Sequence, residues 1–295
     1  MEFFYRLRAA LVLVAIVLNT LVMCVFLFLF TLLKLILPFA PIRRPINRIL
    51  AVIAEIWIGN NNAAIRLVSR VKLTVTGTDD LDYKSWYLVT ANHQSWADIL
   101  LLQMVFNRRI PLLKFFLKQE LIKVPILGLA WWALDFPFMK RYTKAEIEAN
   151  PSLKGKDLET TRKACEKFKE MPTSVMNFFE GTRFTQAKHD QQQSPYRHLL
   201  KPKAGGTAFA LSAMGGKLST LLDVTLVYPD HAPTSLMAFL GGHIRHVDII
   251  VTRRPIPEWA ATGDYENDPQ FRLRFQEWIS TIWAEKDQLI DERLG

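Results

Sequence analysis

The chain opens with a long apolar stretch. No charged residue occurs in the 25 positions from Ala9 to Leu33, whereas Arg6 and Arg8 precede the stretch and Lys34 follows it. As a helix this segment would be roughly 38 Å long, enough to cross the ~30 Å hydrocarbon core of a bilayer with some tilt. A secretory signal peptide is the alternative, but its apolar region is usually only about 7–15 residues long. The pattern therefore predicts a membrane-associated helix.

A second helical pattern begins at Pro45 and is expected to stop at Gly59 and the asparagines that follow it. Its apolar positions recur at three- and four-residue spacing: Ile46, Ile49, Leu50, Ile53, Ile56 and Trp57. Such a helix could lie among lipid headgroups or pack on a protein core, and the sequence leaves both open. Residues 1–62 are predicted to be a two-helix membrane anchor. If the first helix spans the membrane, the larger number of basic residues after it places the rest of the chain in the cytoplasm. If the two helices form a re-entrant pair, both ends of the pair lie on the same face of the membrane.

Strand and helix patterns alternate through residues 63–295, which are predicted to form one α/β domain. Strands are expected at 71–76, 86–91, 174–179, 224–228 and 246–253, and helices at 99–106, 156–169, 204–214 and 271–283. Two short helices are expected before residue 134, and the polar stretch 185–197 is expected to be a mobile loop. The predicted fold is a mixed sheet covered by helices, with a C-terminal amphipathic helix.

Composition narrows the class of protein. Half of the 295 residues are apolar and 22% are charged, which excludes a disordered chain and a polytopic transporter. The net charge of +9 fits anionic lipid or a phosphorylated ligand. No nucleic-acid-binding motif is present, so no nucleic-acid partner is predicted. The two cysteines, Cys24 and Cys165, show neither disulfide nor zinc-site spacing, so no metal site is predicted, and a reducing, cytoplasmic side fits.

The segment Asn92–Asp98 carries the first candidate chemistry. It follows a predicted buried strand and precedes an apolar helix, with Ser95 as the expected helix cap. His93 would then lie at the carboxyl end of a strand, where open α/β sheets bind ligands. Asp98 can reach back to the imidazole, fix its tautomer and stabilise the imidazolium. A structural histidine beside a capping aspartate is the simpler alternative.

Two further segments place cations beside predicted strands. Phe178–Arg183 ends a strand with a turn in which Gly181 allows close approach to a ligand and Arg183 can grip a phosphate. An ion pair between Arg183 and Glu180 would be a purely structural role. Asp135–Arg141 ends in Lys140 and Arg141 beside apolar residues, and a solvated edge is its simpler reading.

These segments resemble the glycerophospholipid acyltransferase family, typified by 1-acylglycerol-3-phosphate acyltransferase. Asn92–Asp98 matches its Asn-His-x-x-x-x-Asp block fully. Phe138–Arg141 matches the block ending Phe-x-x-Arg, although Asp135 stands where glycine is usual. Phe178–Arg183 matches Phe-Pro-Glu-Gly-Thr-Arg, with Phe179 in place of proline.

Two more blocks complete the resemblance in the family's order. Val224–Pro229 matches a late apolar block that ends in proline. The family's Lys-x-x-Leu…Pro-x-x-Gly stretch is represented by Lys118, Leu121, Pro125 and Gly128. The resemblance extends from about Val71 to Pro229.

The resemblance implies transfer of a fatty acyl group from acyl-CoA or acyl carrier protein to the free hydroxyl of a lysophospholipid, such as 1-acylglycerol-3-phosphate. His93 is implied as general base and Asp98 as the residue that orients it. The implied substrate-binding residues are Glu180, Gly181, Thr182, Arg183, Arg141 and Lys118. The acyl donor is a co-substrate, and no cofactor is implied. No Gly-x-Ser-x-Gly elbow is present, which argues against a covalent acyl-enzyme.

The segments 116–119 and 137–142 resemble a bacterial inner-membrane branch of the family, which implies a catalytic domain on the cytoplasmic face. The implied partners are membrane lipids, the lysophospholipid acceptor and the donor; the sequence does not indicate an oligomeric state. Lysophosphatidylglycerol and lysocardiolipin remain alternative acceptors. A non-catalytic membrane adaptor and a membrane-attached lipid hydrolase are the alternatives of other classes.

Overall fold

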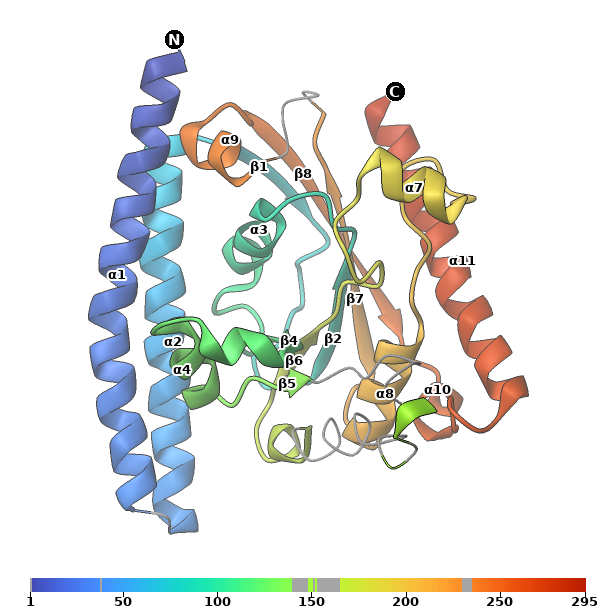
Figure 1. Cartoon of the computed structure of the whole chain (residues 1–295), viewed down its shortest axis with the longest axis horizontal. Helices are drawn as coiled ribbons and strands as arrows, with labels where there is room; N and C mark the ends of the chain where they lie inside the picture. The colour runs from blue at the N-terminus through green and yellow to red at the C-terminus, as the bar shows by residue number, and fades with distance from the viewer. Residues whose placement is uncertain (1, 38, 140–147, 151, 153–164, 230–234) are drawn as a thin grey trace.

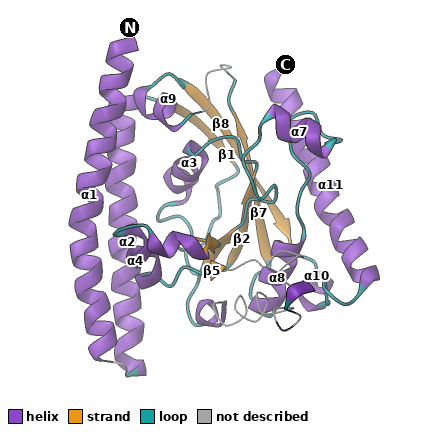
Figure 2. Ribbon diagram, in the orientation of Figure 1, coloured by secondary structure: helices purple, strands orange, loops and turns teal. Residues whose placement is uncertain are grey.

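The protein is a mixed α/β sheet flanked by a long helical hairpin (Figures 1 and 2). The computed structural model describes residues 2–37, 39–139, 148–150, 152, 165–229 and 235–295. Helices cover both faces of the sheet, as the alternating sequence pattern predicts. Both cysteines are free and buried.

The central sheet places the carboxyl ends of β2, β6 and β7 at the same edge. Its six strands follow the order β1-β8-β7-β2-β6-β3, in which β7, β2, β6 and β3 are parallel to one another and β8 and β1 run the opposite way. The bounds are β1 Lys72–Thr76, β2 Tyr87–Ala91, β3 Leu113–Phe115, β6 Ser174–Met176, β7 Thr220–Val227 and β8 His246–Pro255. The loops that follow β2, β6 and β7 therefore emerge side by side.

Two hydrophobic cores lie on the two faces of this sheet. One contains α3 (Ala97–Phe106) and α9 (Leu236–Gly241), together with residues of the hairpin. The other contains α8 (Gly205–Met214), α10 (Glu258–Thr262) and α11 (Pro269–Leu294). Every residue of β2 is buried, because this strand lies between the two layers.

A smaller layer connects the sheet with the hairpin. It contains β4 (Leu117–Lys118) paired with β5 (Phe138–Met139), the short helix η1 (Gln119–Lys123) and α4 (Leu127–Ala133). Residues of α4 share a third core with the hairpin. Most of the helix predicted over 156–169 lies outside the described residues; η3 (Lys167–Lys169) is the short helix at its end.

The hairpin consists of α1 (Glu2–Ile36) and α2 (Ala40–Ser69), which run antiparallel (Figure 1). The predicted end of the second helix at residues 59–62 is wrong, because α2 continues to Ser69. Its asparagines contact α1: Asn61 accepts from Asn19 at 2.7 Å, and Asn60 donates to Asn19 at 3.0 Å. Polar residues that resemble a helix stop are thus used for helix pairing, and residue 62 lies inside α2.

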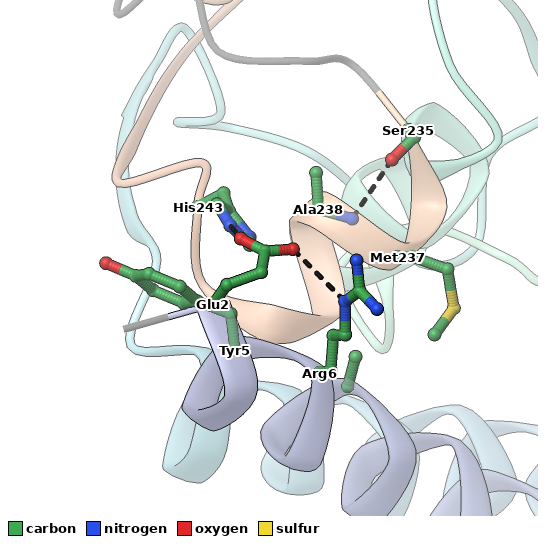
Figure 3. A pocket seen from close by; sticks show the side chains of 8 residues that line it. Glu2, Tyr5, Arg6, Ser235, Met237, Ala238 and His243 are labelled. Carbon is green, nitrogen blue, oxygen red and sulfur yellow. Dashed lines mark hydrogen bonds and ion pairs between the residues drawn. The ribbon is translucent and has the colours of Figure 1, made fainter.

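The α/β domain contacts the hairpin along most of its length. Near the N-terminus, α9 approaches α1 so closely that a Cβ on Gly241 would lie 2.7 Å from the Tyr5 carbonyl oxygen. Glu2 there lies between Arg6 and His243, beside a cavity of about 600 Å³ (Figure 3). Near the other end, Lys34 forms an ion pair with Asp135 at 2.8 Å. The hairpin is therefore attached to the domain sideways rather than by one end.

The predicted loop 185–197 contains a helix, α7 (Gln186–Gln192), so that prediction is wrong. Thr185 caps it by accepting a hydrogen bond from the Lys188 backbone N–H at 3.3 Å. His189 and Tyr196 close the segment through a 2.7 Å contact between the imidazole Nε2 and the Tyr196 carbonyl. The residues of α7 are polar but mostly good helix formers, and polarity alone suggested a loop.

A buried lysine attaches the C-terminal helix to the sheet. Lys286 of α11 is 1% exposed, and its ammonium lies 2.7 Å from Asp223 of β7 and 2.5 Å from the Val224 carbonyl oxygen. Arg254 also pairs with Asp223, at 3.2 Å. Burial lowers the pKa of the Lys286 ammonium, and the Asp223 carboxylate opposes that change by stabilising the charge. Val224 pairs with Ala91, so the lysine holds the strand next to the loop that follows β2.

We expect Lys286→Ala to lower the free energy of unfolding by about 3 kcal/mol, because the buried Asp223 carboxylate keeps Arg254 as a partner but loses its fully buried one. Thermal unfolding in detergent measures this, with Lys84→Ala as the exposed-lysine control. The double variant Asp223→Leu/Lys286→Met should recover most of the loss, since it removes both charges. Equal melting temperatures for Lys286→Ala and the control would show that the pair contributes little.

Candidate active site

Three loops meet at the carboxyl edge of the sheet. They follow β2, β6 and β7 and carry His93, the turn 178–183 and Tyr228. The Asn92 side chain donates to the Leu226 carbonyl and accepts from the Leu226 N–H, both at 2.8 Å, and so extends the pairing of β2 with β7. The Phe184 N–H donates to the His93 carbonyl at 2.7 Å, which joins the β6 loop to the histidine.

The His93 ring bonds to Asp98 through one nitrogen only. Its Nδ1 lies 2.8 Å from Asp98 Oδ2. With the proton on Nδ1, the Nε2 lone pair is available to accept a proton from a substrate. The His93 side chain is 12% exposed and the Asp98 side chain is fully buried, so the imidazole reaches the surface and the carboxylate does not.

Asp98 also organises the loop around it. The same Oδ2 atom accepts from the Gln94 N–H at 2.7 Å and the Ser95 N–H at 2.8 Å, while the Tyr228 hydroxyl donates to Oδ1. Ser95 Oγ accepts from the Ala97 N–H at 3.0 Å, but α3 begins at Ala97 with Trp96 as its N-cap, so the expected cap at Ser95 lies one residue too early. The backbone and β7 thus hold the carboxylate ready for the imidazole.

An aromatic ring fixes the plane of the imidazole. Phe178 stacks on His93 with ring centroids 4.0 Å apart and an interplanar angle of 15°. Phe115 of β3 stacks on Phe178 from the side, at 6.5 Å. Sequence reasoning missed both Phe178 and Tyr228 as neighbours of His93. Phe178 follows β6 and Tyr228 follows β7, so both lie at the same edge of the sheet as His93. This position could have identified them, but only with the strand order known.

Glu180 faces the interior rather than the solvent. It is 1% exposed, and its Oε1 accepts from the His93 N–H at 3.4 Å. Its Oε2 has no hydrogen-bond partner among the described residues. Burial raises the pKa of this carboxyl to about 8, so it holds its proton at neutral pH. The geometry makes Glu180 a support of the His93 loop, and its contact with substrate stays a prediction.

The turn after Glu180 carries the exposed cation of Arg183. Gly181 has φ of +66°, a conformation that glycine adopts without strain. The Thr182 hydroxyl accepts from Lys188 Nζ at 2.8 Å. The exposed guanidinium of Arg183 lies over the Trp96 ring, 4.9 Å from its centroid, and no ion pair joins it to Glu180 within the described ranges. Arg183 therefore lies over Trp96, a residue of the His93 loop, and Glu180 does not neutralise its charge.

Two predicted substrate-binding residues remain, Lys118 and Arg141. Lys118 is exposed on β4, and no described hydrogen bond or ion pair links it to His93. Arg141 lies outside the described residues, so its role stays a prediction. In the part of the chain that the structure describes, no group of three or more His, Cys, Asp or Glu side chains could hold a metal ion.

The sequence matches the family model described as Acyltransferase over residues 72–229. The chain belongs to the acyltransferase family. The match begins at β1 and ends directly after Tyr228, so it includes every loop of the site.

Relatives within the family carry a consistent name. The chain is 26% identical over 186 residues to mouse 1-acyl-sn-glycerol-3-phosphate acyltransferase gamma, covering 60% of this chain and 44% of that protein. It is 25% identical over 218 residues to the human delta form, covering 70% and 52%. The chain thus spans about half the length of the curated relatives it matches.

A solved structure has the same fold. The crystal structure of the 1-acyl-sn-glycerophosphate (LPA) acyltransferase PlsC from Thermotoga maritima superposes with a TM-score of 0.55 at 16% identity. The match covers 97% of this chain and 98% of that one, so it includes the helical hairpin as well as the sheet. At this identity the likeness shows the fold alone.

Asp98→Asn should lower kcat by roughly 10²–10⁴-fold, because the amide cannot stabilise the imidazolium. The fold should survive, since the amide oxygen can still accept from the backbone and the Tyr228 hydroxyl can turn to accept from the amide. Steady-state kinetics and circular dichroism measure the two effects. Tyr228→Phe is the matched control, because it removes one donor to Asp98 and leaves the charge; a loss of kcat in Asp98→Asn no larger than in this control would reduce Asp98 to a helix cap.

Proposed function

We propose that this protein is a membrane-associated O-acyltransferase that moves a fatty acyl group from a thioester donor to the free hydroxyl of a lysophospholipid. The proposed acceptor is 1-acylglycerol-3-phosphate, which gives phosphatidic acid. The observation that carries the proposal is a histidine, 12% exposed, that a fully buried carboxylate orients through Nδ1, in a loop whose Trp96 lies under the exposed guanidinium of Arg183. The His93 imidazole would activate a hydroxyl, and the Arg183 guanidinium would bind a phosphate that lies a few bonds away from that hydroxyl.

The proposed reaction has one transfer step. His93 Nε2 takes the proton of the acceptor hydroxyl as its oxygen attacks the thioester carbonyl. The new C–O bond forms, the C–S bond breaks, and the imidazolium, stabilised by Asp98, returns the proton to the thiolate. The buried Asp98 and the stacked Phe178 keep the imidazole in position during this exchange. Cys165 is fully buried, and burial raises the pKa of its thiol to about 12, which argues against a covalent acyl-cysteine.

The hairpin supports the membrane part of the proposal. By length and composition, α1 is one helix of the described chain that could cross a membrane. Many of its apolar side chains are exposed; among them are Leu11, Val14, Leu18, Leu21, Val25 and Leu29. The α/β domain, however, packs beside the hairpin from Ala9 to Lys34. A hairpin perpendicular to the bilayer would carry the polar domain into hydrocarbon. We therefore place the hairpin in one leaflet, roughly parallel to the surface.

The cytoplasmic face of a bacterial inner membrane is the proposed location of the domain. Acyl-CoA and acyl carrier protein, the two donor classes, are made in the cytoplasm. Two free cysteines agree with a reducing compartment. The basic residues near both ends of α1, Arg6, Arg8 and Lys34, suit an anionic lipid surface.

The deciding experiment is mass spectrometry of lipid products made by purified full-length protein. The reaction contains a thioester donor and, in turn, 1-acylglycerol-3-phosphate, lysophosphatidylglycerol and lysocardiolipin. Phosphatidic acid should form in the first reaction and fall at least 10²-fold in His93→Ala. Free fatty acid released without any acceptor would show a hydrolase instead. Absence of product from every acceptor with a folded protein would favour a non-catalytic adaptor.

We expect Arg183→Lys to raise the KM for the phosphate-bearing acceptor by roughly 10–150-fold, as the loss of a charge-assisted hydrogen bond implies. A guanidinium fork matches two phosphate oxygens, whereas an ammonium offers a point charge. Kinetics with both substrates varied separates this role from a structural one. If acceptor and donor KM rise equally and the melting temperature falls, Arg183 holds the turn instead of the ligand.

A further inference from the structure

A second cavity lies on the opposite side of the turn 178–183 from His93. The alternation of side chains after β6 shows the two sides: Phe178 stacks on His93, whereas the next residue, Phe179, packs on Trp283 of α11. The cavity lies on the α11 side, between the segment 195–205 and α11, and has a volume of about 480 Å³. We call it the α8–α11 cavity. Its volume is within the range of small-molecule sites.

Its walls combine cations with aromatic rings. The polar lining includes Lys201, Lys203, Tyr196, Tyr265 and Gln276. Among the described residues, neither lysine has an acidic partner within ion-pair distance. Both lysines are exposed, and both tyrosines are partly exposed. Cations without ion-pair partners beside aromatic side chains suit a ligand that is both phosphorylated and planar.

The cavity is connected to the catalytic turn by direct contacts. The Lys203 N–H donates to the Phe179 carbonyl at 2.6 Å. The Lys203 side chain crosses Gly181 so closely that a Cβ there would lie 3.2 Å from Lys203 Cδ and 3.6 Å from its Nζ. Gly181 belongs to the turn that bonds to the His93 carbonyl through Phe184. One short turn therefore separates the lysine from the reacting centre.

We propose that the α8–α11 cavity binds the phosphorylated nucleotide end of an acyl-CoA donor, with Lys201 and Lys203 contacting its phosphates. This inference rests on the proposed acyl transfer and chooses between its two donor classes. In CoA a long pantetheine arm separates the thioester from the phosphates and the adenine. A nucleotide site across the turn from His93 matches that separation.

The acceptor phosphate fits this cavity poorly. In a lysophospholipid only a short glycerol segment lies between the hydroxyl and the phosphate. With the hydroxyl at His93 Nε2, the phosphate falls on the side of Arg183 and Trp96, where the guanidinium is already in place. Lys203 instead lies against Gly181 and lines the α8–α11 cavity.

An acyl carrier protein is also the weaker match. Its prosthetic arm carries one phosphate and no nucleotide, and its acidic helices need an exposed convex contact rather than a hollow. The two tyrosine side chains would contact no planar ligand in that complex. The cavity therefore favours the nucleotide-bearing donor.

Equilibrium binding and kinetics on full-length protein in detergent test the proposal separately from catalysis. Calorimetric titration with adenosine 3′,5′-bisphosphate should show binding that weakens at least about tenfold in Lys201→Ala/Lys203→Ala. Lys84→Ala is the control, because this exposed lysine precedes β2 at the opposite edge of the sheet. Ser280→Trp is a second variant that fills the cavity from the exposed face of α11 and keeps both lysines.

Kinetics then compare acyl-CoA with S-acyl-pantetheine, which lacks the nucleotide. The double variant should raise the KM for acyl-CoA at least about tenfold relative to that for S-acyl-pantetheine. An equal rise for both thioesters, no binding of the bisphosphate to the wild type, or transfer from acyl carrier protein but not from acyl-CoA would each overturn the inference. Bisphosphate binding without transfer to any lysophospholipid would instead overturn the proposed function and leave the nucleotide site standing.

Discussion

The arrangement of the site depends on one buried carboxylate. Asp98 accepts hydrogen bonds from the imidazole, from two backbone N–H groups of its own loop and from the hydroxyl of Tyr228 on the neighbouring strand. A buried charge without such partners would be too costly to keep. The groups that stabilise the charge therefore also fix the loop. The carboxylate thus fixes the start of α3, the orientation of the His93 ring and the contact with Tyr228 at the same time. A shift of any one of them would leave a hydrogen-bond donor unpaired.

The sheet provides the second constraint. Because β2, β6 and β7 are parallel, the three loops that follow them meet at one edge of the sheet. The first and last of these loops lie more than 100 residues apart in the sequence. Alternation at the end of β6 then divides the edge into two sides, with Phe178 toward the imidazole and Phe179 toward α11. Lys286 and Asp223 attach α11 to β7 beneath this edge. The proposed acceptor side and the proposed donor side are thus formed by adjacent residues of one strand end.

Sequence reasoning recovered what local patterns encode. Strands β1, β2 and β8 and helices α3, α8 and α11 all lie where periodicity predicts them, and Asp98 accepts from the Ser95 N–H as their spacing suggests. It failed where tertiary contacts override a local signal. Asn60 and Asn61 resemble a helix stop, yet they pair with Asn19 of another helix. The polar residues of α7 resemble a loop, yet a threonine cap and good helix formers make a helix.

The site residues divide in the same way. His93, Asp98 and Arg183 are identifiable from blocks in the chain, because their chemistry lies in the residue type. The importance of three other residues comes from their position in the fold: Tyr228, Phe178 and Lys203. They can be recognised only once the strand order and the close approach of Lys203 to Gly181 are known. The internal orientation of Glu180 is of the same kind: its charge suggests a ligand contact, and only its 1% exposure shows that it supports the loop.

The sideways attachment of the hairpin has a consequence for how the enzyme would meet its substrates. With the hairpin lying in one leaflet, as proposed, contacts at both of its ends fix the height of the catalytic edge above the lipid. The acceptor would then reach the site by lateral diffusion in the plane of the bilayer, whereas a water-soluble donor would reach it by diffusion through the aqueous phase. The velocity would follow the mole fraction of acceptor in the bilayer, and inert lipid would slow the reaction by surface dilution even at constant bulk concentration.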